Sequence, residues 1–357
     1  MSIRGDFERS IFVTGGAGFI GINLIDYLTE KYPHYLIINL DSLTYAANEK
    51  SLETVRNRNN YRFEKIDITD NDSLRKSLAE YRPDGIIHLA AETHVDRSIR
   101  NPGDFIETNI KGTFNLLEAV RENSGDDRNV RFHHISTDEV FGSETTGGLF
   151  SEESKYYPSS PYAASKASAD HLVRAYHKTY GIDTVTTNCG NNFGPYQFPE
   201  KLIPLTILNA LEKKPIPVYG DGKQVRDWIY VVDHCRGIDT VFHKGQSGGT
   251  YNIGSGNEVP NIDLIKMICS LLDKKLGGTH GDLIRHTEDR PGHDRRYAID
   301  PSKIENELGW KPRYNFADAL EETVDWYLNN REWLYSCVDK NYRDYYRKQY
   351  TLDSGKQ

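Results

Sequence analysis

The sequence predicts an α/β protein: a doubly wound parallel sheet followed by a smaller α/β lobe. Three observations lead to this fold class. Short apolar runs alternate with helix-like stretches up to Cys189, a glycine-rich turn follows the first apolar run, and prolines become frequent after Asn191. Short apolar strands separated by helices are typical of a parallel sheet that helices cover on both faces. We therefore expect the first half of the chain to form that sheet.

The elements of this sheet follow from the apolar runs and the helical stretches between them. Strands are predicted at Ser10–Thr14, Tyr35–Leu40, Tyr61–Ile66, Gly85–Leu89, Val130–Ser136 and Thr184–Cys189. Helices are predicted at Gly18–Lys31, Asn71–Glu80, Asp104–Asn123 and Ser160–Tyr180.

The pattern changes after Asn191, where prolines separate short elements. A turn is expected at Tyr219–Gly222, one more strand at Thr250–Ile253, and helices at Asn261–Leu272 and Asn315–Asn329. We expect two domains. A nucleotide-binding sheet domain would span 1–190 and take back about 231–256, and a ligand-binding domain would span 191–230 and 257–357.

Composition narrows the class of protein. The 357 residues are 37% hydrophobic and 27% charged, with a formal charge of −8, which is typical of a soluble globular protein. No basic run is long enough to follow a phosphate backbone, so nucleic acid is not an expected partner. No apolar run reaches membrane-spanning length, so no membrane association is expected. The four cysteines are scattered without metal-binding spacing, which predicts reduced thiols in a cytoplasmic protein and no metal site.

The glycine-rich turn, Thr14–Gly21, joins the first strand to the first helix. Gly15, Gly18 and Gly21 permit a tight turn, close approach of a pyrophosphate and close packing of helix on strand. Asp41 follows at the end of the second strand, where a carboxylate accepts from ribose hydroxyls and repels a 2′-phosphate. This order predicts a Rossmann-type domain that binds NAD rather than NADP. The plainer alternative is a turn-forming glycine cluster with a helix-capping aspartate.

A second group of residues indicates chemistry. Tyr162 and Lys166 are four residues apart on a predicted helix, so the ammonium can lie near the phenol and lower its pKa toward working pH. Thr137, Asp138 and Glu139 follow the fifth strand, at the edge of the sheet where ligands bind. Two adjacent carboxyl groups can have pKa values that differ enough for one to act as acid and one as base. A base, a hydride acceptor and an acid/base pair together suggest oxidation coupled to elimination. Surface polarity, helix capping and turn formation are the alternatives for these residues.

At this point the chain resembles the extended short-chain dehydrogenases/reductases, and specifically the dTDP-glucose 4,6-dehydratases. The resemblance runs from Ile11 to about Trp310. It rests on TGGAGFIG (14–21), HLAAETHVDRS (88–98), STDEVFG (136–142), YAASKASAD (162–170), NCGNNFGPYQFPEKLIP (188–204), YGDGKQVRDWIYVVDH (219–234) and DRPGHDRRYAID (289–300). The Thr-Asp-Glu triplet is the specific part, because related epimerases and decarboxylases generally lack it. Ile22, Gly190 and Phe193 depart from the usual family residues, and none is an expected catalytic position.

The resemblance implies a lyase that converts dTDP-glucose to dTDP-4-keto-6-deoxyglucose and serves deoxysugar biosynthesis, for example of rhamnose. Tyr162 would take the O4 proton while the C4 hydride passes to tightly held NAD, and Lys166 would support the phenolate. Glu139 would remove the C5 proton, and Asp138 would protonate O6 so that water leaves. The hydride would then return to C6. Thr137 would hydrogen-bond O4.

Binding residues also follow from the resemblance. On the cofactor side these are Gly15, Gly18, Phe19, Ile20, Gly21, Asp41, Ser42, Leu43, Thr44, Asp67, Ile68, Leu89, Ala90, Ala91, Glu92, Thr93, Thr108, Tyr162, Lys166 and Asn192. On the nucleotide-sugar side they are His94, Ser136, Thr137, Asp138, Asn191, Lys201, Leu202, Pro217, Val218, Tyr219, Arg226, Asn261, Asp289, Arg290, Pro291, Gly292 and His293. Arg226 and Arg290 are independently plausible because a guanidinium matches diphosphate oxygens, although each could be a solvated surface charge.

Three alternatives stay open at this stage: a UDP-glucose 4,6-dehydratase, a nucleotide-sugar C4 epimerase in which Asp138 and Glu139 would be idle, and a silent NAD-binding scaffold. The resemblance also implies a homodimer formed by the helices at Asp104–Asn123 and Ser160–Tyr180. Leu116, Leu117, Leu172 and Val173 could supply its apolar contacts, or could pack on their own sheet instead.

Overall fold

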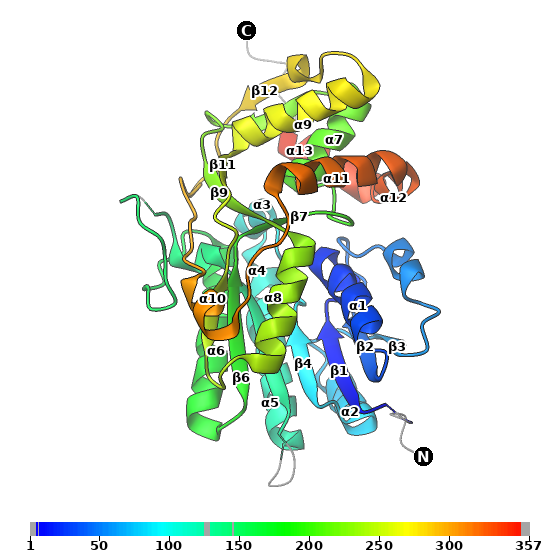
Figure 1. Ribbon diagram of the computed structural model, residues 1–357, viewed down its shortest axis with the longest axis vertical. Coiled ribbons are helices and arrows are strands. Elements are labelled where there is room, and N and C mark those ends of the chain that lie inside the picture. Colours follow the sequence, from blue (N-terminus) through cyan, green and yellow to red (C-terminus); the bar gives the residue numbers. More distant parts are fainter. Residues whose placement is uncertain (1–4, 6, 125–128, 145, 351–357) are drawn as a thin grey trace.

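The computed structural model describes residues 5, 7–124, 129–144 and 146–350 (Figure 1). Its main sheet has seven parallel strands in the order β10-β6-β5-β4-β1-β2-β3. The strands are β1 (Arg9–Thr14), β2 (Tyr35–Asp41), β3 (Tyr61–Lys65), β4 (Gly85–His88), β5 (Arg131–Thr137), β6 (Thr184–Cys189) and β10 (Thr250–Ile253). Each strand end lies within one residue of its predicted place. The doubly wound parallel sheet is therefore confirmed.

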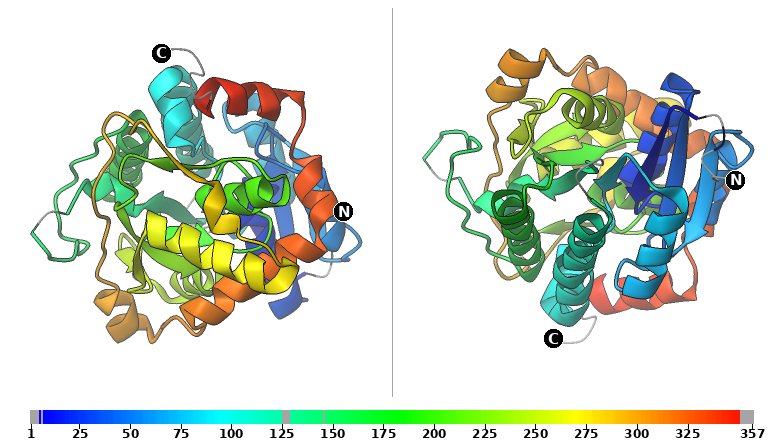
Figure 2. Two further views of the ribbon diagram at one scale, coloured as in Figure 1. Left: turned by 90° about the horizontal axis from the view of Figure 1, so that it is seen from above. Right: turned by 90° about the horizontal axis from the view of Figure 1, so that it is seen from below.

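Helices cover both faces of this sheet because its apolar side chains alternate between two cores (Figure 2). Ile11 and Val13 of β1 belong to the core under α1 (Phe19–Lys31) and α8 (Val231–Lys244). Phe12 belongs to the opposite core, under α2 (Asn71–Tyr81), α5 (Thr113–Asn123) and α6 (Pro161–Tyr180). Leu116, Leu117 and Val173 are almost completely buried in that second core, and Leu172 packs against it. These leucines and the valine therefore pack on their own sheet. They do not supply the apolar contacts of the expected homodimer.

The helix predicted over Asp104–Asn123 is wrong in detail. The chain forms α4 (Pro102–Phe105), a π-helical segment η2 (Ile106–Gly112) and then α5. Asn109, inside the wide turn, accepts a hydrogen bond from the Glu92 amide at 2.8 Å and donates to the Ser165 hydroxyl at 2.8 Å. π-Helical turns are frequent at functional sites, and sequence periodicity does not reveal them.

The C-terminal lobe lies beyond the carboxyl edge of the main sheet (Figure 1). It holds a three-stranded sheet of β11 (Glu258–Pro260), β9 (Val225–Tyr230) and β7 (Asn191–Phe193), and a pair of parallel strands, β8 (Ile216–Tyr219) and β12 (Ile284–Thr287). Its helices are α7 (Leu202–Leu211), α9 (Asn261–Leu276), α11 (Phe316–Asn329), α12 (Arg331–Ser336) and α13 (Lys340–Tyr350). The predicted turn is present, with a hydrogen bond of 3.0 Å from the Gly222 amide to the Tyr219 carbonyl.

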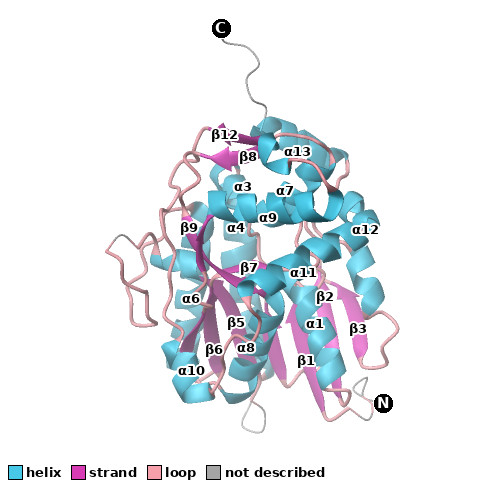
Figure 3. Cartoon of the chain, turned by 45° about the horizontal axis from the view of Figure 1, so that its top comes forward, coloured by secondary structure: helices cyan, strands magenta, loops and turns pink. Residues whose placement is uncertain are grey.

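Short elements connect these layers: α3 (Val95–Arg100), α10 (Ser302–Leu308) and the 3₁₀ turns η1 (Glu49–Thr54), η3 (Asp138–Phe141) and η4 (His280–Leu283). Between β9 and β11 the chain returns to the main sheet, where α8 covers one face and β10 pairs with β6 (Figure 3). The ends of β1, β4, β5 and β6 therefore face the lobe. Within the described part of the chain, no helix combines the length and apolarity needed to cross a membrane.

Candidate active site

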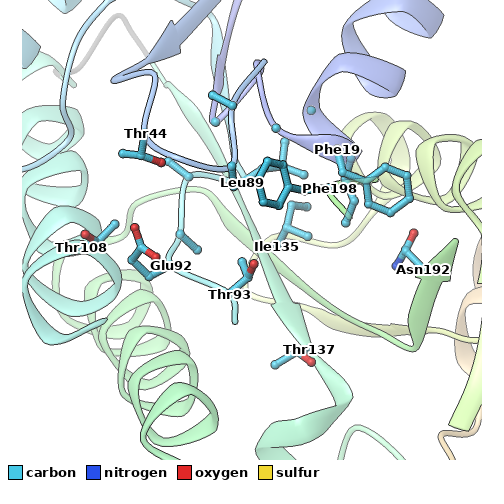
Figure 4. A pocket seen from close by; sticks show the side chains of 18 of the residues that line it. Phe19, Thr44, Leu89, Glu92, Thr93, Thr108, Ile135, Thr137, Asn192 and Phe198 are labelled. Atoms are coloured by element: carbon cyan, nitrogen blue, oxygen red, sulfur yellow. The ribbon is translucent and has the colours of Figure 1, made fainter. Parts of the chain in front are cut away.

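A cavity of about 300 Å³ lies at the carboxyl ends of the parallel strands, under the C-terminal lobe (Figure 4). Nineteen of the twenty predicted cofactor-side residues line it: Gly15, Gly18, Phe19, Ile20, Gly21, Asp41, Ser42, Thr44, Asp67, Ile68, Leu89, Ala90, Ala91, Glu92, Thr93, Thr108, Tyr162, Lys166 and Asn192. Ser136, Thr137, Asp138, Glu139, Asn191 and Lys201 line it too. The cavity therefore joins the glycine loop to the predicted catalytic groups.

The glycine loop fits a dinucleotide. Gly15 has φ of +73°, and a Cβ there would lie 2.7 Å from the Cα of Ala90. A Cβ on Gly21 would lie 2.2 Å from the carbonyl oxygen of Gly15. Side chains larger than hydrogen would close this cradle, and the loop opens helix α1, whose N-terminal dipole end favours a pyrophosphate. No side chain of the described residues caps α1 at Gly18.

Asp41 connects the loop to the second strand. Its carboxylate accepts from the amide of Ala17 at 2.9 Å and from the amide of Leu43 at 2.7 Å. Burial raises its pKa, and these two hydrogen bonds oppose that rise. Each carboxylate oxygen has two lone-pair positions, so the group can hold the loop and still accept from a ribose.

Leu43 is the one predicted cofactor residue that does not line the cavity. Its φ is +58° and its side chain packs against the core shared with α1. The sharp backbone turn that lets its amide reach Asp41 directs the side chain away from the cavity.

Tyr162 and Lys166 face the cavity from α6, but their electrostatics differ from the expectation. The pKa of Tyr162 is raised well above its usual value, first by burial and then by the nearby Glu139. Lys166 donates to the carbonyl of Ile135 at 2.7 Å, and burial lowers its pKa to about 8. The predicted lowering of the Tyr162 pKa is therefore wrong for the protein alone, because burial and the adjacent carboxyl groups raise this pKa more than the hydrogen bond with Thr137 lowers it.

Asp138 and Glu139 begin the turn after β5 and have different surroundings. Asp138 is buried, and burial together with Glu139 raises its pKa well above the usual value. Burial also raises the pKa of Glu139, but Arg290, Arg226 and Lys201 oppose it. The protonated form is thus favoured at Asp138, while three cations favour the carboxylate of Glu139. Such a pair can supply one acid and one base.

Most predicted nucleotide-sugar residues do not line this cavity. Those outside the lining are His94, Leu202, Pro217, Val218, Tyr219, Arg226, Asn261, Asp289, Arg290, Pro291, Gly292 and His293. Several of them bond one another or their neighbours. Tyr219 donates to Asp96 at 2.9 Å, Arg290 lies 3.6 Å from the same carboxylate, and Arg226 donates to the carbonyl of Asp294 at 3.0 Å.

Unpaired polar groups also mark this side. Asn191 Oδ1, Asn261 Oδ1 and Arg290 Nε are buried without a hydrogen-bond partner among the described residues. Buried polar atoms without partners are costly, so these three are candidates to bind a ligand.

Val218 was expected to bind the nucleotide sugar, but its side chain points into the protein core. It is buried in the main core, while the neighbouring Pro217 and Tyr219 are more exposed. Alternation along β8 places Val218 on the face opposite to Pro217 and Tyr219, so only its backbone can meet a ligand there. Leu202 packs against the same core from the start of α7.

The structure adds residues that the sequence interpretation missed. Leu40, Ala46, Ala47, Ile66, Ile135, Cys189, Gly190, Gln197, Phe198 and Glu200 also line the cavity. Asp170 stands behind it: its carboxylate accepts from Ser136 at 2.8 Å, lies 3.1 Å from His134 and raises the pKa of Lys166. The signal was the spacing of Tyr162, Lys166 and Asp170, which puts one residue per turn on one helical face.

Comparisons with known proteins agree with this geometry. The family model described as GDP-mannose 4,6 dehydratase matches residues 12–323. The dTDP-glucose 4,6-dehydratase of Neisseria meningitidis serogroup B is 52% identical over 347 residues, which cover 94% of this chain and 98% of the relative. The dTDP-glucose 4,6-dehydratase 1 of Escherichia coli K12 is 49% identical over 356 residues, which cover 95% of this chain and 98% of the relative.

Solved structures give the same result. The dTDP-glucose 4,6-dehydratase of Streptomyces venezuelae, solved with NAD and dTDP bound, superposes with a TM-score of 0.86 at 45% identity, covering 92% of this chain and 100% of that one. A UDP-glucose 4-epimerase of Thermus thermophilus, solved with NAD, superposes with a TM-score of 0.80 at 27% identity. The match covers 90% of this chain and 99% of the epimerase. The chain thus belongs to the dTDP-glucose 4,6-dehydratase family of NAD-dependent extended short-chain dehydrogenases/reductases.

Proposed function

We propose that this protein is a dTDP-glucose 4,6-dehydratase: with NAD as a recycled cofactor it converts dTDP-glucose to dTDP-4-keto-6-deoxyglucose and water. The observation that carries the proposal is the pair Asp138 and Glu139, placed with Tyr162 and Lys166 in one cavity with the glycine loop. NAD, held over the glycine loop, would supply the hydride acceptor for C4 and the hydride donor for C6.

The residues of this chain handle the protons. Tyr162, as the phenolate, accepts the O4 proton while the C4–H bond breaks and becomes a phenol. Lys166, which stays cationic below about pH 8, favours that phenolate before the transfer. The C4 ketone acidifies C5–H, and Glu139 takes that proton. Asp138 gives its proton to O6, so that the C6–O bond breaks and water leaves. The proton on Glu139 returns to C5 when hydride reaches C6. Tyr162 then holds the O4 proton and Asp138 lacks one, so a proton lost from Tyr162 to solvent and one gained by Asp138 from solvent restore both groups for the next turnover.

The burial pattern supports these roles. Asp138 needs a proton before water can leave, and burial raises its pKa in the direction that favours the protonated form. Glu139 needs to be a carboxylate at the start, and Arg226, Arg290 and Lys201 favour that form. A C4 epimerase transfers hydride to and from one carbon, so it would need neither carboxyl group. The acid pair is what favours the dehydratase over the epimerase.

An isotope experiment tests the reaction. Purified protein is incubated with dTDP-glucose that carries deuterium at C4, and the product is examined by proton NMR and mass. Deuterium in the new methyl group, with loss of one water, is expected. Deuterium that remains at C4 or appears in solvent would refute the proposal. UDP-glucose run in parallel measures the base preference.

We also propose that the protein is a cytoplasmic homodimer and that each subunit has the two domains given in the sequence analysis. The product of the reaction would serve deoxysugar synthesis, for example of rhamnose. Ile106 and Phe114, on the helical segments η2 and α5, are 55% and 43% exposed, which leaves an apolar face for a second copy. Sedimentation of the wild-type protein beside Phe114→Glu tests this: the variant is expected to be monomeric, and a wild-type monomer would refute the dimer.

A further inference from the structure

The guanidinium of Arg97, on α3, lies between two tyrosine rings that come from distant parts of the chain. Its central carbon is 3.7 Å from the ring centre of Tyr45 and 4.1 Å from that of Tyr345. Tyr45 belongs to the segment after β2, and Tyr345 belongs to α13, the last described helix. Figure 2 shows α13, in red, beside the cyan helices that follow β4. Stacking on two aromatic faces while bonding a carboxylate is geometry that arginine allows and lysine does not.

The same guanidinium also binds Glu200, a residue of the cavity wall. Its Nε donates to Glu200 at 3.0 Å, and the other oxygen of Glu200 accepts from the Tyr45 hydroxyl at 3.2 Å. Glu200 lines the cavity, and its side chain is 1% exposed. Burial raises its pKa, and Lys201 and Arg97 oppose that rise. Without Arg97 this carboxylate would lose its direct ion-pair partner.

The contacts of Arg97 lie beside the cavity wall formed by the segment after β2, which follows Asp41, the residue expected to bind the adenosine ribose. Thr44, Ala46 and Ala47, which flank Tyr45, line that side, and Phe198 packs edge-on against Tyr45 at 5.9 Å. Helix α13 supports the same wall, because the Tyr342 hydroxyl donates to the carbonyl of Pro199 at 3.0 Å. The cavity wall is therefore held from outside by α3 and α13 together.

We propose that Arg97 is a positioning residue for cofactor retention: by clamping Tyr45 and Glu200 against Tyr345 of α13, it keeps the wall over NAD closed through the catalytic cycle. The inference rests on the proposed function, because a reaction that returns its hydride to the same sugar needs the nucleotide to stay bound between the two transfers. It gives α13, which lies outside the motifs of the family resemblance, a role in holding the cofactor.

The test measures release of NAD from purified holoenzyme without any sugar nucleotide. Free nucleotide is removed, samples are passed through a desalting column over time, and protein-bound NAD is quantified. Release from Arg97→Met is expected to be about tenfold faster than from wild type, because two cation–π contacts and an ion pair are lost. Arg97→Lys keeps the charge for Glu200 but loses the stacking, so it is also expected to release NAD several-fold faster, by roughly half the effect on a logarithmic scale.

Two controls separate the clamp from a general loss of stability. Arg100→Met changes another arginine of α3. The Arg100 guanidinium is 5.9 Å from the Tyr345 ring centre and donates to the Lys348 carbonyl at 3.1 Å, so it lies near α13 but is not the partner of Glu200, and the variant is expected to release NAD at the wild-type rate. Tyr345→Leu removes one stacking face and is expected to act like Arg97→Lys, whereas Tyr345→Phe keeps the ring and is expected to act like wild type.

The clamp is refuted if both Arg97→Met and Tyr345→Leu release NAD at a rate within twofold of wild type. If Arg97→Met does not fold, the release rate of Tyr345→Leu decides the question. The result is independent of the sugar. A wild-type protein that retains NAD but does not dehydrate dTDP-glucose would refute the proposed function and leave the clamp standing.

Discussion

The cofactor side and the nucleotide-sugar side of this molecule differ in how they are built. The cofactor side consists of strand ends and the turns directly after them, and nearly all its predicted residues line one cavity. The nucleotide-sugar side takes its residues from β8, β9, the start of α9 and the segment 289–293, and most of them lie outside that cavity. Arg290 and Tyr219 both contact Asp96 there, and His293 pairs with Asp289.

The difference shows which kind of site is assembled before its ligand arrives. Parallel strands end at one edge, so residues that follow them are gathered by backbone hydrogen bonds alone. Loops of the lobe have no such frame, and their charged groups pair with one another until a ligand replaces those partners. The cofactor side should therefore control the rate of chemistry for any accepted sugar nucleotide, and the nucleotide-sugar side should control which nucleotide is accepted.

The largest effect is expected from Tyr162→Phe. The phenolate of Tyr162 is the proposed acceptor of the O4 proton, so kcat is expected to fall by about 10³-fold, within the range for loss of a general base. The formation of the 4-keto product, read from its chromophore in alkali, measures this. Both dTDP-glucose and any accepted UDP-glucose should be affected equally, with bound NAD unchanged. A variant that loses one nucleotide far more than the other would break the division between the two sides.

Glu139→Gln is expected to lower dehydration by about 10²-fold to 10³-fold, because an amide cannot take the C5 proton. Incubation in deuterium oxide followed by NMR measures exchange at C5, which should disappear together with the product. Asp138→Asn is the companion variant: it should keep C5 exchange while losing water elimination. If Glu139→Gln still exchanges C5–H at the wild-type rate, Glu139 is not the base.

Arg226→Lys is expected to act on the other side and to raise KM for dTDP-glucose about tenfold while changing kcat little. Arg226 is buried over the Tyr297 ring at 4.1 Å, and lysine cannot reproduce a planar fork for diphosphate oxygens. Initial rates over a range of substrate concentration measure the two constants. An effect confined to kcat would mean that Arg226 serves the chemistry through Glu139 rather than binding.

The smallest effect is expected from Asp170→Asn and concerns pH. Lys166 has its pKa lowered to about 8, so the ammonium and the activity that needs it are present below that pH and are lost above it. The Asp170 carboxylate opposes the lowering, and removing its charge should move the alkaline limb of kcat about one unit lower. Ser136→Ala, which removes a hydrogen bond to Asp170 but no charge, is the matched control and should leave the limb in place.

Much of the site could be predicted from the sequence where its residues are contiguous in short motifs. The glycine loop, the Thr137–Glu139 triplet and the pair Tyr162 and Lys166 all lie where strand and helix patterns put them. The missed cavity residues Phe198 and Glu200 lie within the motif at 188–204, but in the segment between β7 and α7, whose path to the cavity no periodicity reveals. The side-chain directions of Leu43 and Val218 were also out of reach, since they depend on one backbone turn and on the face of one strand.

The sequence by itself determined the parallel sheet, its strand ends and the candidates for the reacting groups, because apolar alternation and short motifs are local properties. Only the tertiary structure decided the charge on those groups. Burial of Tyr162 raises the pKa that Lys166 was expected to lower. Arg226 lowers the pKa of both Asp138 and Glu139, whereas Arg290 and Lys201 from the lobe lower that of Glu139. Desolvation and charge–charge interactions depend on which residues of distant segments come within a few ångströms, and linear order does not contain that information.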